Sequence, residues 1–278
     1  MIVEVGILEL VSSIVGSVLR EPWLRVSRLP AGRAQPPSPG RRQSPSYGTP
    51  APRVQPPGRF KALVAGAVLL AGVGTTGAAG QTAAAPLRIV ALGDSLVAGY
   101  GLPPGDAFPV RLQKALAGGG RTGRPVEIVN AGVSGDTATD GLSRLDWAIG
   151  DDVDGVIVEL GANDALRGID PAVTRKALDE VLKRLTARGL PVLLAGMLAP
   201  PNLGPAYKAA FDPIFPELAA AHGTLLYPFF LDGVAAERGL NQPDGMHPNG
   251  KGVGVIVERI LPKVEELIAL AAARRDRS

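Results

Sequence analysis

Cysteine is absent from the sequence, histidine occurs only twice and aromatic residues are scarce, and each shortage excludes a class of protein. Without cysteine there is no disulfide framework, no thiol nucleophile and no cysteine-ligated zinc site. With only His222 and His247, a metal site built from several histidines is excluded as well. Aromatic residues make up 4% of the 278 residues and hydrophobic residues 46%, so the chain can bury a core, which must be mainly aliphatic.

Positive charge is concentrated at the front of the chain. The formal net charge is +3, but residues 1–61 hold nine of the 29 lysines and arginines and only three of the 26 acidic residues. The remaining residues therefore carry 20 basic and 23 acidic side chains. A nucleic-acid-binding domain would carry a basic face of its own. We therefore expect no nucleic-acid partner.

Composition divides the chain into three zones. Residues 1–58 end in a run rich in proline, arginine, serine and glutamine, which we interpret as a disordered or mis-assigned N-terminal extension. Residues 59–85 place Arg59 and Lys61 before an apolar run and an alanine- and glycine-rich end, the pattern of a secretory signal peptide. Residues 86–278 are the expected folded domain.

The segment that resembles a signal peptide predicts export to the periplasm or the medium. Its apolar run, Ala62–Val73, is shorter than the roughly 20 residues that a transmembrane helix needs. An N-terminal membrane anchor, formed by this run or by Ile2–Leu19, stays open as an alternative. Because signal peptides do not normally begin this far into a chain, we hypothesise that translation naturally starts near residues 54–60.

From residue 86 onward, short apolar runs alternate with longer amphipathic ones. The apolar runs predict five strands, at residues 87–92, 126–129, 155–160, 191–195 and 224–227. Helices are expected at residues 106–117, 137–149, 171–188, 205–222 and 249–273. Asp170 followed by proline marks the start of the third helix, and the last contains Pro262, a residue that can break a helix. The alternation predicts an α/β fold, a three-layer α/β/α sandwich of flavodoxin-like type with a five-stranded parallel sheet.

Four short blocks of polar residues and glycine follow strands or precede the last helix. They are Gly93–Leu96, Asn130–Gly132, Gly161–Asp164 and Asp244–His247. Because the carboxyl ends of parallel strands meet at one edge of a sheet, we expect these blocks to form one site.

Ser95 and His247 are the residue types that hydroxyl nucleophiles require. A serine needs a base to be nucleophilic near neutral pH, and the base needs an orienting group, which Asp244 can supply three residues before His247. Each residue alone also has a structural explanation, because serine or histidine in such a loop can cap the following helix. His222 ends a predicted helix before Gly223, and we interpret it as structural.

Gly132 and Asn163 can supply the donors that acyl transfer needs. Negative charge develops on the carbonyl oxygen, and each preorganised N–H donor lowers the barrier by about 3–4 kcal/mol. Glycine lets the backbone approach closely, and asparagine offers a side-chain amide. An ordinary turn glycine and an Asx-turn are the alternative explanations.

Taken together, the blocks resemble those of the GDSL/SGNH hydrolase superfamily. That family carries a serine in GDS, a glycine, an asparagine in GxND and a DxxH pair, here GDS, NAGVSGDT, GAND and DGMH. The similarity extends over about residues 87–268. Within the superfamily, ALGDSLVAGYGL, VELGANDALRG and GMHPNGKG resemble the bacterial group of arylesterases, acyl-CoA thioesterase I and lysophospholipases, which is typically exported.

The resemblance implies the SGNH fold and a serine esterase that works through an acyl-enzyme without metal or cofactor. Ser95 would be the nucleophile, His247 its base and Asp244 the group that orients the base, while Asp94 supports the turn at Ser95. The implied oxyanion hole consists of the N–H groups of Ser95 and Gly132 and the side-chain amide of Asn163. The implied substrates are small acyl esters or thioesters: aryl esters, acyl-CoA or lysophospholipids, the last derived from membrane lipid.

Three alternatives remain at this stage. The same fold serves carbohydrate O-acetylesterases and acyltransferases. A noncatalytic envelope-binding domain would have lost a block residue, and none is missing. A nucleotide-binding flavodoxin-like domain would need a phosphate-binding loop, and GDSLVAGYG lacks the glycine spacing of GxGxxG. Leu166, Ile169 and Leu198–Gly204 are candidate walls for an acyl chain or ordinary loop packing.

Overall fold

A single parallel sheet forms the centre of the computed structural model, which describes residues 85–119 and 124–277. The strands are β1 (Leu87–Gly93), β2 (Val126–Gly132), β3 (Gly155–Glu159), β4 (Val192–Ala195) and β5 (Leu225–Tyr227). Their order is β2-β1-β3-β4-β5, and every neighbouring pair is parallel. The expected extension and signal-like segment lie outside the described residues.

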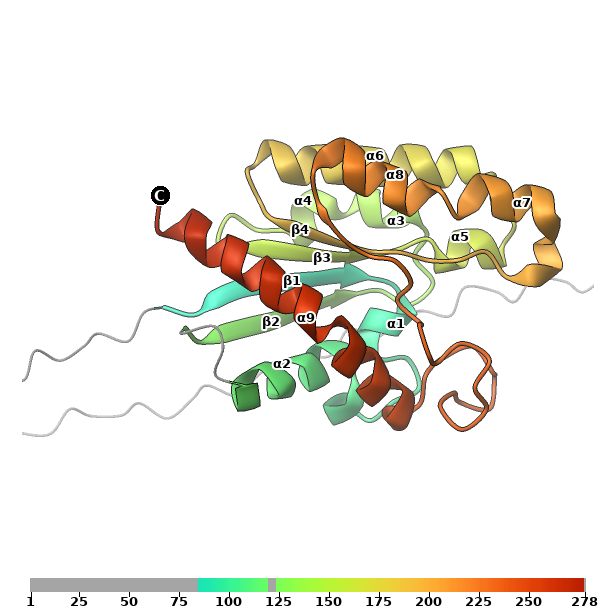
Figure 1. Cartoon of the computed structure of the whole chain (residues 1–278), viewed down its shortest axis with the longest axis horizontal. Coiled ribbons are helices and arrows are strands. Elements are labelled where there is room, and N and C mark those ends of the chain that lie inside the picture. Colours follow the sequence, from blue (N-terminus) through green and yellow to red (C-terminus); the bar gives the residue numbers. More distant parts are fainter. Residues whose placement is uncertain (1–84, 120–123, 278) are drawn as a thin grey trace, which may run out of the picture. The chain divides into compact units, whose positions relative to one another are not determined.

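Helices cover both faces of the sheet (Figure 1). They are α1 (Ser95–Ala98), α2 (Phe108–Gly119), α3 (Ala138–Ser143), α4 (Leu145–Ala148), α5 (Ala162–Leu166), α6 (Pro171–Ala187), α7 (Gly204–Phe211), α8 (Ile214–His222) and α9 (Gly250–Arg275), with two 3₁₀ turns, Pro104–Asp106 and Pro201–Leu203. Helices α2 and α9 pack together on one face, and α3, α6 and α8 pack on the other. The predicted three-layer fold is confirmed. Within the described ranges, no helix combines the length and apolar content needed to cross a bilayer.

The strands are apolar because both faces of the sheet are covered. All residues of β3 and β4 are buried, and β1 is buried except for Arg88. In register, Gly93 at the end of β1 pairs with Gly132 on one side and Glu159 on the other. The carboxyl ends of the three strands are thereby aligned at the edge of the sheet that carries the polar blocks.

Several helix boundaries differ from the sequence prediction. The helix expected at 137–149 divides at Arg144, and the one expected at 205–222 divides at Asp212–Pro213, where proline cannot donate to the preceding turn. Helix α9 runs through Pro262 without a break. The buried side chains on both sides of this proline, Ile260 and Val264 among them, hold the helix against the sheet and offset the lost hydrogen bond.

Candidate active site

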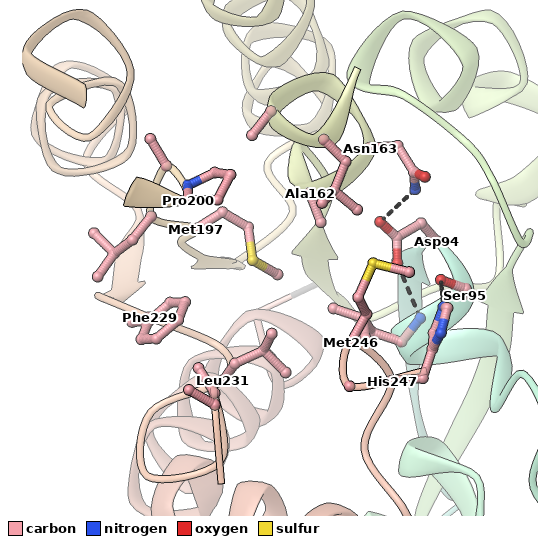
Figure 2. Close-up of a pocket in the computed structure, with 18 of the residues that line it drawn as sticks. Asp94, Ser95, Ala162, Asn163, Met197, Pro200, Phe229, Leu231, Met246 and His247 are labelled. Carbon is pink, nitrogen blue, oxygen red and sulfur yellow. Dashed lines mark hydrogen bonds between the residues drawn. The ribbon is translucent and has the colours of Figure 1, made fainter. Parts of the chain in front are cut away.

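The four blocks meet at the carboxyl edge of the sheet. Ser95 follows β1, Gly132 ends β2, Asn163 lies on α5 after β3, and His247 lies in the loop before α9. Figure 2 shows Ser95 and His247 side by side, with Asp94 between Ser95 and Asn163. The structure therefore brings together residues from four separate parts of the sequence.

The turn at Ser95 is capped by its neighbour and leaves the serine hydroxyl available. Asp94 is the N-cap of α1, and its Oδ1 accepts the N–H of Leu96 at 2.9 Å. Ser95 is the first residue of the helix, so its hydroxyl has no capping role. A side chain at Gly93 would collide with Val97 and lie 2.8 Å from the carbonyl oxygen of Glu159. Glycine is therefore required where the strand turns into the helix.

Ser95, His247 and Asp244 form a continuous hydrogen-bonded chain. His247 Nε2 lies 2.9 Å from Ser95 Oγ, and His247 Nδ1 lies 2.7 Å from Asp244 Oδ2. Asp244 Oδ1 also accepts the backbone N–H groups of His247 (3.0 Å) and Met246 (2.9 Å).

These bonds determine which ring nitrogen carries the proton. The backbone bond from His247, followed by the one from Met246, lowers the pKa of Asp244 to about 2. The carboxylate is then ionised at neutral pH and can only accept hydrogen bonds. Nδ1 of His247 must therefore donate to Asp244, which leaves Nε2 as the acceptor of the Ser95 hydroxyl. This arrangement can remove a proton from a serine nucleophile.

Tyr100 supports the imidazole, a contact that the sequence did not indicate. Its ring centroid lies 4.8 Å from that of His247 at an interplanar angle of 41°, while 55% of the residue is exposed. Gln242 Nε2 donates to the carbonyl oxygens of Tyr100 (2.8 Å) and Pro248 (3.0 Å). The segment after α1 is thereby tied to the histidine loop.

Both predicted oxyanion donors beyond Ser95 have acceptors within the protein. Gly132 N–H donates to Asn130 Oδ1 at 2.9 Å. The Asn163 amide donates to Asp94 Oδ2 at 2.9 Å and to the carbonyl oxygen of Asp136 at 3.0 Å. Donors engaged in this way must share or exchange their acceptors before they can serve a substrate oxygen.

Ser95 and Gly132, the two predicted backbone donors, both adjoin α1. As the first residue of α1, Ser95 has an N–H without an intrahelical acceptor. Gly132 packs directly on α1: a Cβ there would collide with Ala98 N and lie 2.8 Å from Ala98 Cα. The close approach of two backbone segments explains why glycine occupies this position.

A largely buried ion pair holds the loop whose Asp136 carbonyl accepts the Asn163 amide. Arg144 Nε donates to Asp136 Oδ2 at 2.6 Å, and Arg144 Nη2 donates to Gly93 O at 2.9 Å. The exposed fractions of the two side chains are only 14% and 12%. The loop after β2 is therefore fixed to the end of β1, close to the nucleophile.

An apolar pocket of about 520 Å³ opens beside the serine. Its lining includes Asp94, Ser95, Leu96, Ala162, Asn163, Ala165, Leu166, Met197, Leu198, Ala199, Pro200, Pro201, Phe229, Leu231, Ala235, Ala236, Asn241, Gly245, Met246 and His247. Figure 2 shows Met197, Pro200, Phe229 and Leu231 on the side of the pocket opposite Ser95 and His247.

The pocket includes only part of the predicted acyl wall. Leu166 and Leu198–Pro201 line it, whereas Ile169 is not among the described lining residues and accepts a hydrogen bond from Tyr207 through its carbonyl oxygen. Phe229, Leu231 and Met246 were missed. The first two follow the short strand β5 in a loop whose course no local pattern indicates.

His222 lies outside this arrangement. On α8, its Nε2 is 2.7 Å from Asp179 Oδ1 of α6, and it is not among the described residues that line the pocket. The pair joins two neighbouring helices on one face of the sheet, as expected for a structural histidine.

Comparison with known proteins gives a consistent result. Residues 91–255 match the GDSL-like lipase/acylhydrolase family. The chain is 39% identical to esterase TesA of Pseudomonas aeruginosa over 189 residues, which cover 68% of this chain and 92% of that protein. It is 35% identical to thioesterase 1/protease 1/lysophospholipase L1 of Escherichia coli, over 67% of this chain and 87% of that protein.

A solved structure shows the same fold. The SGNH-hydrolase family esterase AlinE4 is 44% identical and superimposes with a TM-score of 0.55, covering 66% of this chain and 96% of that one.

Proposed function

The chain belongs to the GDSL-like lipase/acylhydrolase family of SGNH hydrolases, and on that premise we propose that Ser95 cleaves carboxylic esters and thioesters through an acyl-enzyme. Family membership makes the protein a GDSL-type esterase or acylhydrolase. The observation that supports Ser95 as the nucleophile is the hydrogen-bonded chain from its hydroxyl through His247 to Asp244.

The first half of the proposed reaction acylates the serine. As Ser95 Oγ attacks the carbonyl carbon, its proton passes to His247 Nε2, and Asp244 stabilises the resulting imidazolium. The tetrahedral intermediate then expels the alcohol or thiol, which takes that proton from His247 as its bond to the acyl carbon breaks. The Tyr100 ring beside His247 adds a cation–π contact to the charged imidazole.

The second half returns the enzyme to its starting state. A water molecule gives a proton to His247 Nε2 and attacks the acyl carbon, and the bond to Ser95 Oγ breaks as the oxygen regains that proton. In both halves the carbonyl oxygen becomes negative. We assign its stabilisation to the N–H groups of Ser95 and Gly132 and to the Asn163 amide.

The acyl chain of the substrate is proposed to occupy the apolar pocket. Each methylene transferred from water contributes about 0.8 kcal/mol, or roughly fourfold in kcat/KM, until the pocket is filled. The relatives are named for esterase, arylesterase, thioesterase and lysophospholipase activities, and this supports aryl esters, acyl thioesters and lysophospholipids as substrates.

A chain-length series tests this assignment. Full-length protein would be assayed on p-nitrophenyl acetate, butyrate, octanoate and palmitate and on matched thioesters, and kcat/KM should rise beyond acetate. Leu231→Trp should shift the optimum to shorter chains, while Leu270→Trp on α9, outside the described pocket lining, should not. A preference for acetylated carbohydrates over every longer acyl chain would instead support the O-acetylesterase alternative.

We further propose that residues 59–85 direct the enzyme out of the cytoplasm, to the periplasm or the medium. The support is the order of basic flank, apolar run and small residues in this segment. Cell fractionation and intact-mass analysis of protein expressed from its natural gene would test the proposal. A mature protein that begins near residue 86 is expected, and a membrane-bound species that keeps the segment would indicate an anchor.

A further inference from the structure

Glu159 is a fully buried acid beneath the nucleophile that the proposed reaction does not use. It is the last residue of β3 and pairs in register with Gly93, the last residue of β1. Its Oε2 accepts the backbone N–H of Asp94 at 3.4 Å. Asp94 is fully buried as well, so two carboxyl groups are buried next to each other.

The hydrogen bonds around the pair distinguish the two acids. Asp94 accepts two bonds through its side chain, from Leu96 N–H and from the Asn163 amide, as a carboxylate does. Glu159 Oε1 has no hydrogen-bond partner among the described residues. An unpartnered oxygen is far less costly on a neutral carboxylic acid than on a buried anion. A side-chain hydrogen bond also joins the two carboxyls.

We propose that Glu159 is a positioning residue: it holds the proton of a carboxylic acid–carboxylate pair and donates it to Asp94, fixing the carboxylate that orients both the Ser95 turn and the Asn163 amide. Asp94 then has three donors, the Leu96 N–H, the Asn163 amide and the Glu159 hydroxyl. The inference rests on the proposed function, because it concerns the residues assigned to that reaction.

Electrostatics favour this distribution of the proton. Burial, and then the charge of Asp94, raise the pKa of Glu159 well above its ordinary value. Burial also raises the pKa of Asp94, to about 6, but its hydrogen bonds and the nearby His247 oppose that rise. Arg144, which binds Gly93 O next to Asp94, and its partner Asp136 are further charged groups near the pair.

A neutral Glu159 also benefits the transition state. The proposed oxyanion forms beside Ser95 and Asn163, and the Asn163 amide is bonded to Asp94 of the acid pair. A second negative charge at Glu159 would oppose the charge that develops there, whereas the neutral acid adds none. An apolar residue would avoid the charge as well, but it could not donate to Asp94.

Two substitutions separate these roles. Glu159→Gln keeps the donor and stays neutral, so kcat should remain within about threefold of wild type. Glu159→Leu keeps the volume but loses the donor, and kcat should fall about tenfold or more with KM little changed, because the Asp94 carboxylate that orients the Asn163 amide is no longer fixed. Val158→Ala, at a buried position next along β3, is the matched control: it should lower the melting temperature without lowering kcat.

Infrared difference spectroscopy of the whole protein detects directly whether the Glu159 carboxyl group is protonated. At pH 8, wild type minus Glu159→Gln should show the carbonyl stretch of a protonated carboxylic acid. Absence of that band would overturn the proposal, as would a folded Glu159→Leu variant with wild-type kcat. The spectrum needs neither turnover nor the leucine variant. A wild type inactive on every ester would therefore contradict the proposed function, while the band would still decide the state of Glu159.

Discussion

Two histidine–aspartate pairs have the same nitrogen–oxygen distance of 2.7 Å, yet within the part of the chain that the structure describes only one of them is hydrogen-bonded to a serine. His222 and Asp179 join α8 to α6 through His222 Nε2. His247 and Asp244 lie before α9, where the second ring nitrogen contacts Ser95 Oγ at 2.9 Å. The pair alone is therefore a structural contact. Nucleophilic catalysis also requires a hydroxyl group, and Ser95, which follows β1, supplies it at the same edge of the sheet.

The two pairs also differ in how the aspartate is held. Asp244 accepts two backbone N–H groups in addition to the imidazole, and these fix its orientation. For Asp179 the structure shows the bond to His222 from the exposed surface of α6. Backbone donors cannot rotate away as a side chain can, so the Asp244 carboxylate is preorganised and can keep one tautomer of His247.

The largest expected effect is the loss of the imidazole. His247→Ala should lower kcat/KM on p-nitrophenyl esters by about 10⁵-fold or more, because the serine loses its base. His222→Ala removes the other histidine and should leave kcat/KM within about twofold, since surface pairs contribute little. Comparable losses in both variants would break the distinction between the pairs.

The second effect concerns the aspartates. Asp244→Asn should lower kcat by about 10⁴-fold, because an amide can stabilise the wrong tautomer of His247 and cannot balance its charge. Asp179→Asn is the matched control on α6 and should keep wild-type kinetics. Steady-state assays of both variants, with circular dichroism to verify folding, provide the comparison.

A third, smaller effect is expected at the oxyanion. Asn163→Ala removes a proposed donor and should lower kcat by about 10²–10³-fold with a lesser change in KM. Gly132→Ala would move the backbone, because its Cβ has no room beside Ala98. Asn163→Ala is therefore the clearer test of the proposed oxyanion donors. An unchanged kcat would mean that the amide serves only Asp94 and Asp136.

The smallest effect is on stability in acid. The pKa of Asp244 is lowered from its ordinary value of 3.8 to about 2 in the folded protein. The unfolded chain therefore binds this proton first, and the stabilisation present above pH 3.8 is lost as the pH falls towards 2. Urea unfolding between pH 2 and 5 should show a weaker pH dependence in Asp244→Asn than in wild type, and equal slopes would contradict the assigned pKa.

Much of the fold could be predicted because local patterns determine it. The five strands were predicted as short apolar runs, and Asp170 with its following proline marked the start of α6. The course of α9 through Pro262 could not be predicted, because long-range packing outweighs the local effect of proline. Helices α1 and α5 were missed because four or five residues are too few to show a helical period.

The candidate site divides in the same way. Ser95, His247 and Asp244 could be named because their residue types are rare in combination and their blocks are recognisable. Glu159 and Tyr100 were not, although both lie within or beside those blocks. In the sequence, Glu159 is only the end of a predicted strand and Tyr100 only an aromatic residue in a loop. Their contacts with Asp94 and His247 become visible in the three-dimensional structure. The acceptors of Asn163 and Gly132 are likewise tertiary contacts.

The most direct test of the central claim is to trap the acyl-enzyme. Full-length protein turning over p-nitrophenyl octanoate would be acid-quenched, digested and analysed by mass spectrometry. We predict an octanoyl group on the peptide that contains Ser95, with fragment ions that place it on this residue, and no such group in Ser95→Ala. An acyl group on another residue, or full turnover by Ser95→Ala, would contradict the account.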